Sequence, residues 1–233
     1  HGHVMYSAAR EADLGTNLVH GPYRESGLAR LWRRVVESKA PAFVDFSSYA
    51  PSKGEPASFI GHPVFNATGD LVAVAALQLS PATINAIMNQ RDGMGDSGEA
   101  YLVGPDKLMR SDSFLDPENH SVKASFSDTT GKGKVDTEAS RSALEGKSGS
   151  AIIVDYEGHD VLSSYVPVQI VDTRWALIAE IEKREVRQPV GMLLRSIFGV
   201  IVAAGAILVI VSFVVARQIA GPLTQGMKFA GSV

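Results

Sequence analysis

The sequence predicts an α+β fold in which two similar modules, each an antiparallel sheet with helices on one face, precede a single membrane-spanning helix. Three observations support this prediction. A series of turn-separated strands occurs twice between residues 1 and 182, a helical segment lies in each series, and an uncharged apolar run lies near the C-terminus. The 233 residues are 45% apolar and 20% charged, which is enough apolar material to bury a core.

The first module begins with a predicted strand at Val4–Ala8 and a helix at Ser26–Ser38. Ser26 is a favourable N-cap residue, and apolar residues follow it at helical spacing. These residues are Leu28, Leu31, Trp32, Val35 and Val36. Alternating runs between turn residues then predict three strands, at Ala42–Phe46, Ser58–Phe65 and Leu71–Leu79.

The second module starts after a short helix at Pro81–Asn89, which has proline in its first turn. A predicted hairpin of Ala100–Val103 and Leu108–Asp112 follows. The polar stretch Asp116–Lys134 predicts a long loop. The remaining predicted elements are one helix and three strands, at Thr137–Leu144, Ser150–Tyr156, His159–Pro167 and Trp175–Glu180.

The apolar run Ser196–Ala216 contains 21 residues without a charge. As a helix it would extend about 31 Å, close to the thickness of the hydrocarbon core of a bilayer. A buried helix of a soluble core is the alternative, but such helices seldom lack a polar stripe over this length. Flanking charges do not fix the orientation, because large domains cross the membrane largely regardless of them.

The segment after this run predicts a helix that pairs with a second copy of the chain. Apolar or small residues recur there at spacings of three and four, at Ile219, Leu223, Met227, Ala230 and Val233. Gly221 and Pro222 predict a bend or restart of the helix between Ala220 and Leu223. The predicted boundaries are 1–80 and 81–187 for the two modules, 188–195 for a connector, 196–216 for the membrane helix and 217–233 for the segment after it.

Charge and cysteine content exclude several classes of protein. The formal net charge is −3, so the chain lacks the basic character of most nucleic-acid-binding proteins, and no nucleic acid is expected as a partner. The absence of cysteine excludes disulfide bonds, thiolate metal sites and cysteine nucleophiles.

Two stretches resemble known families. GDSGEAYLVGPDKLMRSDS, at Gly95–Ser113, is similar to the start of the membrane-proximal module of double Cache sensor domains, which consist of PAS-like modules. ARQIAGPL, at Ala216–Leu223, resembles the opening of a HAMP linker helix. Together with the apolar run, these stretches resemble a bacterial methyl-accepting chemotaxis receptor whose first Cache module is incomplete at its N-terminus.

The resemblance implies a non-enzymatic receptor without a cofactor, with its sensor in the periplasm and its helix in the bacterial inner membrane. The implied partners are a small-molecule ligand, a second copy of the chain, the lipid bilayer, and a chemotaxis histidine kinase with its coupling protein, both reached through a cytoplasmic part beyond Val233. The same arrangement also serves membrane histidine kinases and diguanylate cyclases, which stay open as alternatives. A membrane-anchored hydrolase is a more distant alternative, because the sequence offers no confident nucleophile–base pair.

Candidate ligand-binding residues occur in both modules. In the first, Tyr6, Trp32, Asp45 and Tyr49 could hold an amine through cation–π contact and a charged hydrogen bond, unless the aromatic residues belong to the core. The resemblance favours this module, because the membrane-distal module of such receptors usually binds the ligand.

In the second module, Arg110 and Asp112 lie two residues apart, which places them on one face of a strand. Tyr101 and Tyr165 are expected to reach the same face, and Arg110 could bind a carboxylate through two hydrogen bonds. A local ion pair between Arg110 and Asp112 is the alternative.

Three further motifs do not support a site. Gly95-Asp96-Ser97-Gly98 matches the nucleophile tetrad of trypsin-like proteases, but its position predicts a turn that starts a strand. Gly146-Lys147-Ser148 ends like a phosphate-binding loop, yet Arg141 occupies the place of the first glycine. His1 and His3 lack further ligands at metal-binding spacing, so no metal is expected.

Overall fold

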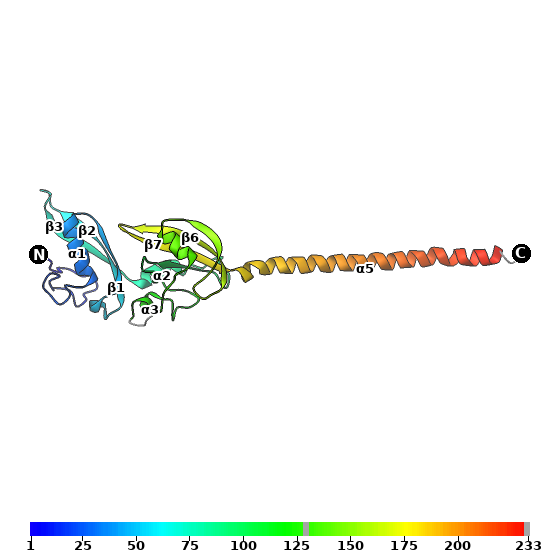
Figure 1. The fold of residues 1–233 in the computed structure, drawn as a ribbon, viewed down its shortest axis with the longest axis horizontal. Coiled ribbons are helices and arrows are strands. Elements are labelled where there is room, and N and C mark those ends of the chain that lie inside the picture. Colours follow the sequence, from blue (N-terminus) through cyan, green and yellow to red (C-terminus); the bar gives the residue numbers. More distant parts are fainter. Residues whose placement is uncertain (128–130, 231–233) are drawn as a thin grey trace. The chain divides into compact units, whose positions relative to one another are not determined.

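The computed structural model describes the backbone of residues 1–127 and 131–230, and the side chains of residues 1–127, 131–187 and 193–218. The chain divides into two compact units, His1–Glu185 and a second unit that starts at Val186. The first unit contains two antiparallel sheets with their helices, and the second consists of helix (Figure 1).

The first module contains a three-stranded sheet with the order β1-β2-β3. Its elements are α1 (Gly27–Ser38), β1 (Ala42–Ser48), the 3-10 turn η1 (Ala50–Ser52), β2 (Pro56–Phe65) and β3 (Leu71–Leu79). The Ser26 side chain accepts a hydrogen bond from the Ala29 N–H at 3.2 Å, as predicted for the N-cap of α1. Leu31 of α1 packs closely on β2, where a Cβ atom at Gly61 would lie 2.8 Å from it. The predicted helix and three strands of this module are therefore confirmed.

The strand predicted at Val4–Ala8 is wrong. The N-terminal 25 residues form turns and one isolated bridge, between His3 and Asn17. Val4 exchanges hydrogen bonds only with the local segment, through Thr16 O at 3.0 Å and Gly15 N at 2.9 Å. The alternating sequence thus pairs with its own neighbouring turn and does not join the sheet.

The second module contains a four-stranded sheet with the order β4-β7-β6-β5, so its first and last strands are neighbours. Its elements are α2 (Pro81–Met88), β4 (Glu99–Val103), α3 (Val122–Phe126), α4 (Glu138–Leu144), β5 (Gly149–Val154), β6 (Asp160–Ile170) and β7 (Thr173–Glu182). Thr137 and Ser140 form a capping box at the start of α4. Ala139 and Ala143 of this helix pack against Ile178 of β7 in the core of the module.

Two predictions for the second module are wrong in detail. Leu108–Asp112 is not a regular strand, because the Ser111 hydroxyl accepts the hydrogen bond of the Leu102 N–H at 2.9 Å, and only single bridges remain. The loop predicted at Asp116–Lys134 contains α3, which Ser121 caps by accepting from the Ala124 N–H. A one-turn helix in a short polar segment has too few apolar residues to produce a periodic pattern, so the sequence did not predict it.

The two modules share a buried core. Phe43 and Phe46 of β1 pack against Trp175 of β7, with ring centroids 5.7 Å and 6.1 Å apart, and against Leu102 and Val122. Alternate residues of β1 face α1 instead, so this strand is buried on both sides.

Helix α5 (Lys183–Ala230) contains the predicted membrane helix. Its segment Leu193–Gln218 has 26 residues, a mean hydropathy of 2.9 and no buried part, so it is long and apolar enough to cross a membrane. The helix continues through Gly221 and Pro222, and the expected restart there is not observed. The side chains of the predicted dimer seam lie outside the described residues, and the seam stays a prediction.

Candidate functional site

The structure separates the residues of the first predicted ligand set. Tyr6 lies in the N-terminal turns and is 83% exposed, so it does not share a sheet face with the others. Trp32 is half-buried beneath the N-terminal segment, where a Cβ atom at Gly2 would lie 3.5 Å from its ring. Trp32 therefore packs against the N-terminal segment and contributes to the structure of the first module.

Asp45 and Arg110, predicted for two different ligand sets, bind each other. The Arg110 Nε donates to Asp45 at 2.8 Å and its Nη2 donates to the second oxygen at 2.9 Å. The guanidinium also donates to Asp106 and to the Leu108 carbonyl, and the Trp175 indole N–H donates to Asp45 at 3.2 Å. Burial disfavours the charge on Arg110, but the hydrogen bonds that it donates to both carboxylates outweigh this effect and raise its pKa. This buried ion pair joins the two modules.

Asp112 binds helices and not Arg110. Its carboxylate accepts from the Asn85 side chain at 2.7 Å and from the Val122 N–H at 2.8 Å. The expected Arg110–Asp112 ion pair is wrong, because this segment is not a regular strand and the two side chains do not share a face. Asp112 instead connects α2 to α3.

Tyr49 is buried and forms a pair that the sequence analysis missed. Its hydroxyl donates to Asp13 at 2.7 Å, and its ring packs edge-on against Phe59. Burial and the Asp13 carboxylate raise the pKa of Tyr49. The second Asp13 oxygen, Oδ1, is buried without a hydrogen-bond partner among the described residues. No local pattern distinguishes Asp13 from other turn residues, so the sequence offered no signal for it.

Tyr101 and Tyr165 lie on the inner face of the second sheet, on either side of Ile178. The Tyr101 hydroxyl donates to Glu180 at 2.7 Å, and burial raises the pKa of Tyr101 well above its ordinary value. Tyr165 covers Gly149 closely, since a Cβ atom there would lie 2.7 Å from its hydroxyl oxygen.

Glu99 lies at the centre of a second buried network that the sequence analysis did not identify. Its carboxylate accepts hydrogen bonds from the Tyr156 hydroxyl, from the Ser113 hydroxyl at 2.7 Å and from the Phe114 N–H at 2.9 Å. The available signal was an acidic residue at the start of the apolar run EAYLV. The network holds the chain after Ser113 against β4.

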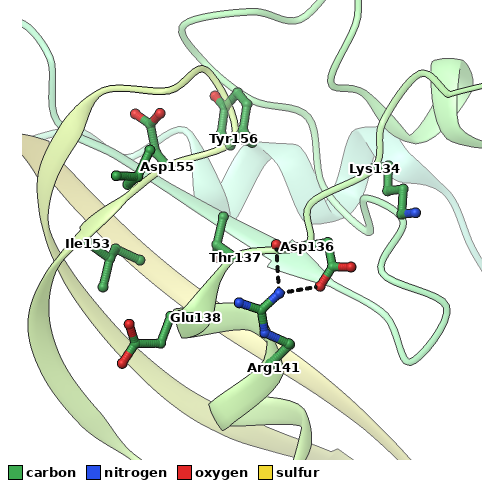
Figure 2. A pocket seen from close by; sticks show the side chains of 9 residues that line it. Lys134, Asp136, Thr137, Glu138, Arg141, Ile153, Asp155 and Tyr156 are labelled. Carbon is green, nitrogen blue, oxygen red and sulfur yellow. Dashed lines mark hydrogen bonds and ion pairs between the residues drawn. The ribbon is translucent and has the colours of Figure 1, made fainter.

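A cavity of about 660 Å³ lies between the start of α4 and the end of β5. Figure 2 shows side chains of both charges around it, with Arg141 donating to the Asp136 carboxylate at 2.9 Å. The lining residues are Lys134, Asp136, Thr137, Glu138, Arg141, Ile153, Val154, Asp155 and Tyr156. This size and this mixture of charges suit a small molecule that carries both a cationic and an anionic group.

Among the described residues, Asp155, Glu157 and His159 could offer ligand atoms to a metal ion, because these atoms lie within 4.8 Å of one another. The group lies in the turn between β5 and β6, where Asp155 accepts from the backbone N–H groups of the other two at 2.8 Å. These bonds account for the arrangement as a turn. At the N-terminus, the His3 ring lies 3.1 Å from the Asn17 side chain.

A family model described as a Cache domain, dCache_1, matches residues 8–190, which is more than half of the chain. The chain belongs to the Cache domain family. The predicted fold, two PAS-like α+β modules followed by one apolar helix, is thereby confirmed.

Solved sensor domains of chemoreceptors are similar to this chain. The periplasmic sensory domain of the Campylobacter jejuni chemoreceptor Tlp1 is 16% identical with a TM-score of 0.50, over 69% of this chain and 57% of that one. The ligand-binding domain of the Pseudomonas aeruginosa amino acid chemoreceptor PctB, in complex with L-Arg, is 19% identical with a TM-score of 0.47, over 78% and 64%. The chain therefore spans less than two thirds of either sensor domain. A comparison with curated protein sequences found no match.

The second Cache module buries an acid in its sheet. Glu180 of β7 lies between Glu99 and Ser163 in the strand register. Its Oε1 and the Ser163 hydroxyl have no hydrogen-bond partner among the described residues. Burial raises the pKa of Glu180, and the hydrogen bond from Tyr101 offsets this only in part.

Replacement of Glu180 by glutamine is expected to make the Cache unit more stable than wild type near neutral pH. The folded-state pKa lies above the ordinary value of 4.5, so wild type loses stability as the pH rises from 4.5 through the folded-state pKa. The variant does not titrate there, so it does not lose this stability. Urea unfolding at several pH values should show that the stability advantage of the variant is smallest near pH 4.5 and grows as the pH rises through the folded-state pKa of Glu180. A difference independent of pH would contradict this expectation.

Proposed function

We propose that this Cache chain is the extracytoplasmic ligand-sensing part of a transmembrane chemotaxis receptor. One observation carries the proposal: the last strand of the second module ends at Glu182, and the helix that can cross a membrane begins at the next residue. A ligand that binds one arrangement of the modules better than another shifts their equilibrium. The strand then passes the change directly into α5.

The proposal locates the Cache modules in the periplasm and α5 in the inner membrane, surrounded by lipid, in a homodimer. The segment from Arg217 onward would be the start of a HAMP linker, and a chemotaxis histidine kinase and its coupling protein would bind a cytoplasmic part encoded after Val233. Histidine kinases and diguanylate cyclases use the same kind of sensor. A methylation-helix bundle encoded after Val233 would distinguish the chemotaxis receptor from both.

The cavity beside α4 is our candidate for the ligand site in the second module. It offers Lys134 to an anionic group and Glu138 to a cationic one, beside the ion pair of Arg141 with Asp136, which suits a ligand of amino acid size. The first-module residues Tyr6, Trp32, Asp45 and Tyr49 are the competing candidate. In that module Tyr49 and Asp45 already bind protein groups.

The full chain in lipid nanodiscs should show a higher melting temperature with at least one member of a panel of free amino acids and small organic acids. A ligand that binds only the folded state at a hundred times its Kd adds about 2.7 kcal/mol, which shifts the melting temperature by several degrees. The Arg141→Ala variant is expected to lose this shift, because its charge at the cavity is gone.

Two controls locate the site. Arg24→Ala removes an exposed arginine that pairs with Glu25 and should leave the ligand-induced shift intact. Trp32→Ala should also leave it intact. A shift that survives in Arg141→Ala and disappears in Trp32→Ala would contradict the cavity assignment and move the site to the first module.

A further inference from the structure

The Glu185 carboxylate is bound by the loop that precedes β4. One oxygen accepts from the Asp96 N–H at 2.8 Å, and the other accepts from the Ser97 N–H at 2.8 Å and from the Ser97 hydroxyl. Two adjacent backbone amides and a hydroxyl thus converge on one carboxylate. Charge-assisted hydrogen bonds of this kind are stronger than neutral ones.

The loop is shaped for this contact. Gly95 has φ +70°, and a Cβ atom there would overlap the Glu185 oxygen, so only glycine allows the approach. On the other side of the loop, Arg91 donates to the carbonyls of Gly95, Asp96 and Gly98 at 2.8–3.0 Å. The carbonyls therefore face Arg91 while the two amides face Glu185. This accounts for the tetrad Gly95–Gly98 without any catalytic chemistry.

The same loop touches both sides of the junction between β7 and α5. The Ser97 hydroxyl oxygen accepts from the Glu182 N–H, the last residue of β7, at 3.1 Å. Glu185 lies in the first turn of α5, where the helix dipole favours a negative charge. The hydrogen bond from Ser97 and the two amides lower the pKa of Glu185, so the carboxylate is charged at neutral pH.

The loop also links the two Cache modules. It follows α2, which the chain reaches directly from β3 of the first module, and it leads into β4 of the second. In the proposed receptor, a shift between the modules would therefore act on this loop. Through Glu185, the loop is hydrogen-bonded to the first turn of α5, the helix that contains the apolar segment Leu193–Gln218.

We infer that Glu185 is a positioning residue, which fixes the first turn of α5 to the Gly95–Ser97 loop and so transmits movement of the loop to the membrane helix. The role in transmission rests on the proposed receptor function. The fixation itself does not, and the two can be tested separately.

The test uses the full chain in nanodiscs and compares Glu185→Ala, Glu185→Gln and the control Asp160→Asn. The control removes the same charge from another contact with the start of α5, the Asp160–Lys183 ion pair. Hydrogen exchange reports the Asp96 and Ser97 amides. Because the chain has no cysteine, a nitroxide on Arg187→Cys, an exposed position, reports the motion of the first turns of α5.

For Glu185→Ala we expect at least about tenfold faster exchange at both amides and a more mobile nitroxide, with exchange in β6 and β7 unchanged. Glu185→Gln should show a smaller effect, since its amide oxygen still accepts, and Asp160→Asn should behave as wild type. In a hybrid receptor, with the signalling part of a chemotaxis receptor joined after Val233, Glu185→Ala should change basal kinase output at least about threefold.

Each contrary result has one meaning. Unchanged exchange at Asp96 and Ser97 in Glu185→Ala would overturn the inference, and so would faster exchange with an unchanged nitroxide spectrum. Altered exchange and mobility with unchanged output from a responsive hybrid would overturn the role in transmission. If the wild-type hybrid never controls the kinase while exchange and mobility change as expected, the receptor proposal fails and the fixation by Glu185 stands.

Discussion

Replacement of Arg110 by alanine is expected to lower the free energy of unfolding of the Cache unit by about 3–5 kcal/mol, the usual cost of removing one partner of a buried ion pair. The Arg110 side chain is 1% exposed and binds Asp45 and Asp106. Its removal leaves two carboxylates without their cation and a void beside Phe126, over whose ring the guanidinium lies at 5.1 Å. Urea unfolding of a truncated chain that ends at Arg187 would measure the loss.

Matched variants separate this structural role from ligand binding. Arg24→Ala removes an exposed arginine and should leave the urea midpoint unchanged. Asp45→Asn should lose much of the same stability, and the double variant should lose less than the sum, because the two residues contact each other. A loss below about 1 kcal/mol for Arg110→Ala would contradict the buried role and return Arg110 to the ligand candidates.

Replacement of Glu99 by alanine is expected to cost about 2–4 kcal/mol, because several buried donors lose their acceptor at once. The Tyr156 and Ser113 hydroxyls and the Phe114 N–H all donate to this carboxylate. The same urea titration would give the loss, and hydrogen exchange at Phe114 and Leu115 should accelerate.

Glu99→Gln should retain part of this stability, since its amide oxygen can still accept from Tyr156 or Ser113. Glu145→Ala, which removes an exposed carboxylate paired with Lys147, serves as the control and should leave the midpoint unchanged. Equal midpoints for Glu99→Ala and wild type would show that water replaces the carboxylate, and that the network does not hold the loop.

Local patterns predicted the regular elements well. The strand Leu71–Leu79 has the predicted bounds, and α1 starts after its predicted cap, because alternation, helical spacing and capping are properties of neighbouring residues. The prediction of a strand at Val4–Ala8 was wrong because it, too, used only the properties of neighbouring residues. The alternation was real, but whether a strand joins a sheet depends on partners elsewhere in the chain.

The candidate site depended on long-range pairs, and those could not be predicted. Asp45 and Arg110 were both identified as charged residues on predicted strands, but 65 positions separate them, and nothing local indicated that they bind each other. Asp13 and Tyr49 are 36 positions apart, and no local pattern predicted the hydrogen bond between them. Motif similarity succeeded where spacing did not, because GDSGEAYLVG reflects a whole loop and strand.

Strand β7 has a mechanical consequence. Its first part places Trp175 in the core shared by the two modules, and its last residue, Glu182, precedes α5. Ten residues of strand extend about 33 Å, and β7 is hydrogen-bonded along both edges, to β4 and β6. Such a strand cannot slide alone, because every hydrogen bond to β4 and β6 would break. It therefore moves together with its sheet. A displacement beside Trp175 is therefore shared along the strand as far as Glu182, where α5 follows, and in a Trp32→Phe background the indole fluorescence of Trp175 would report it.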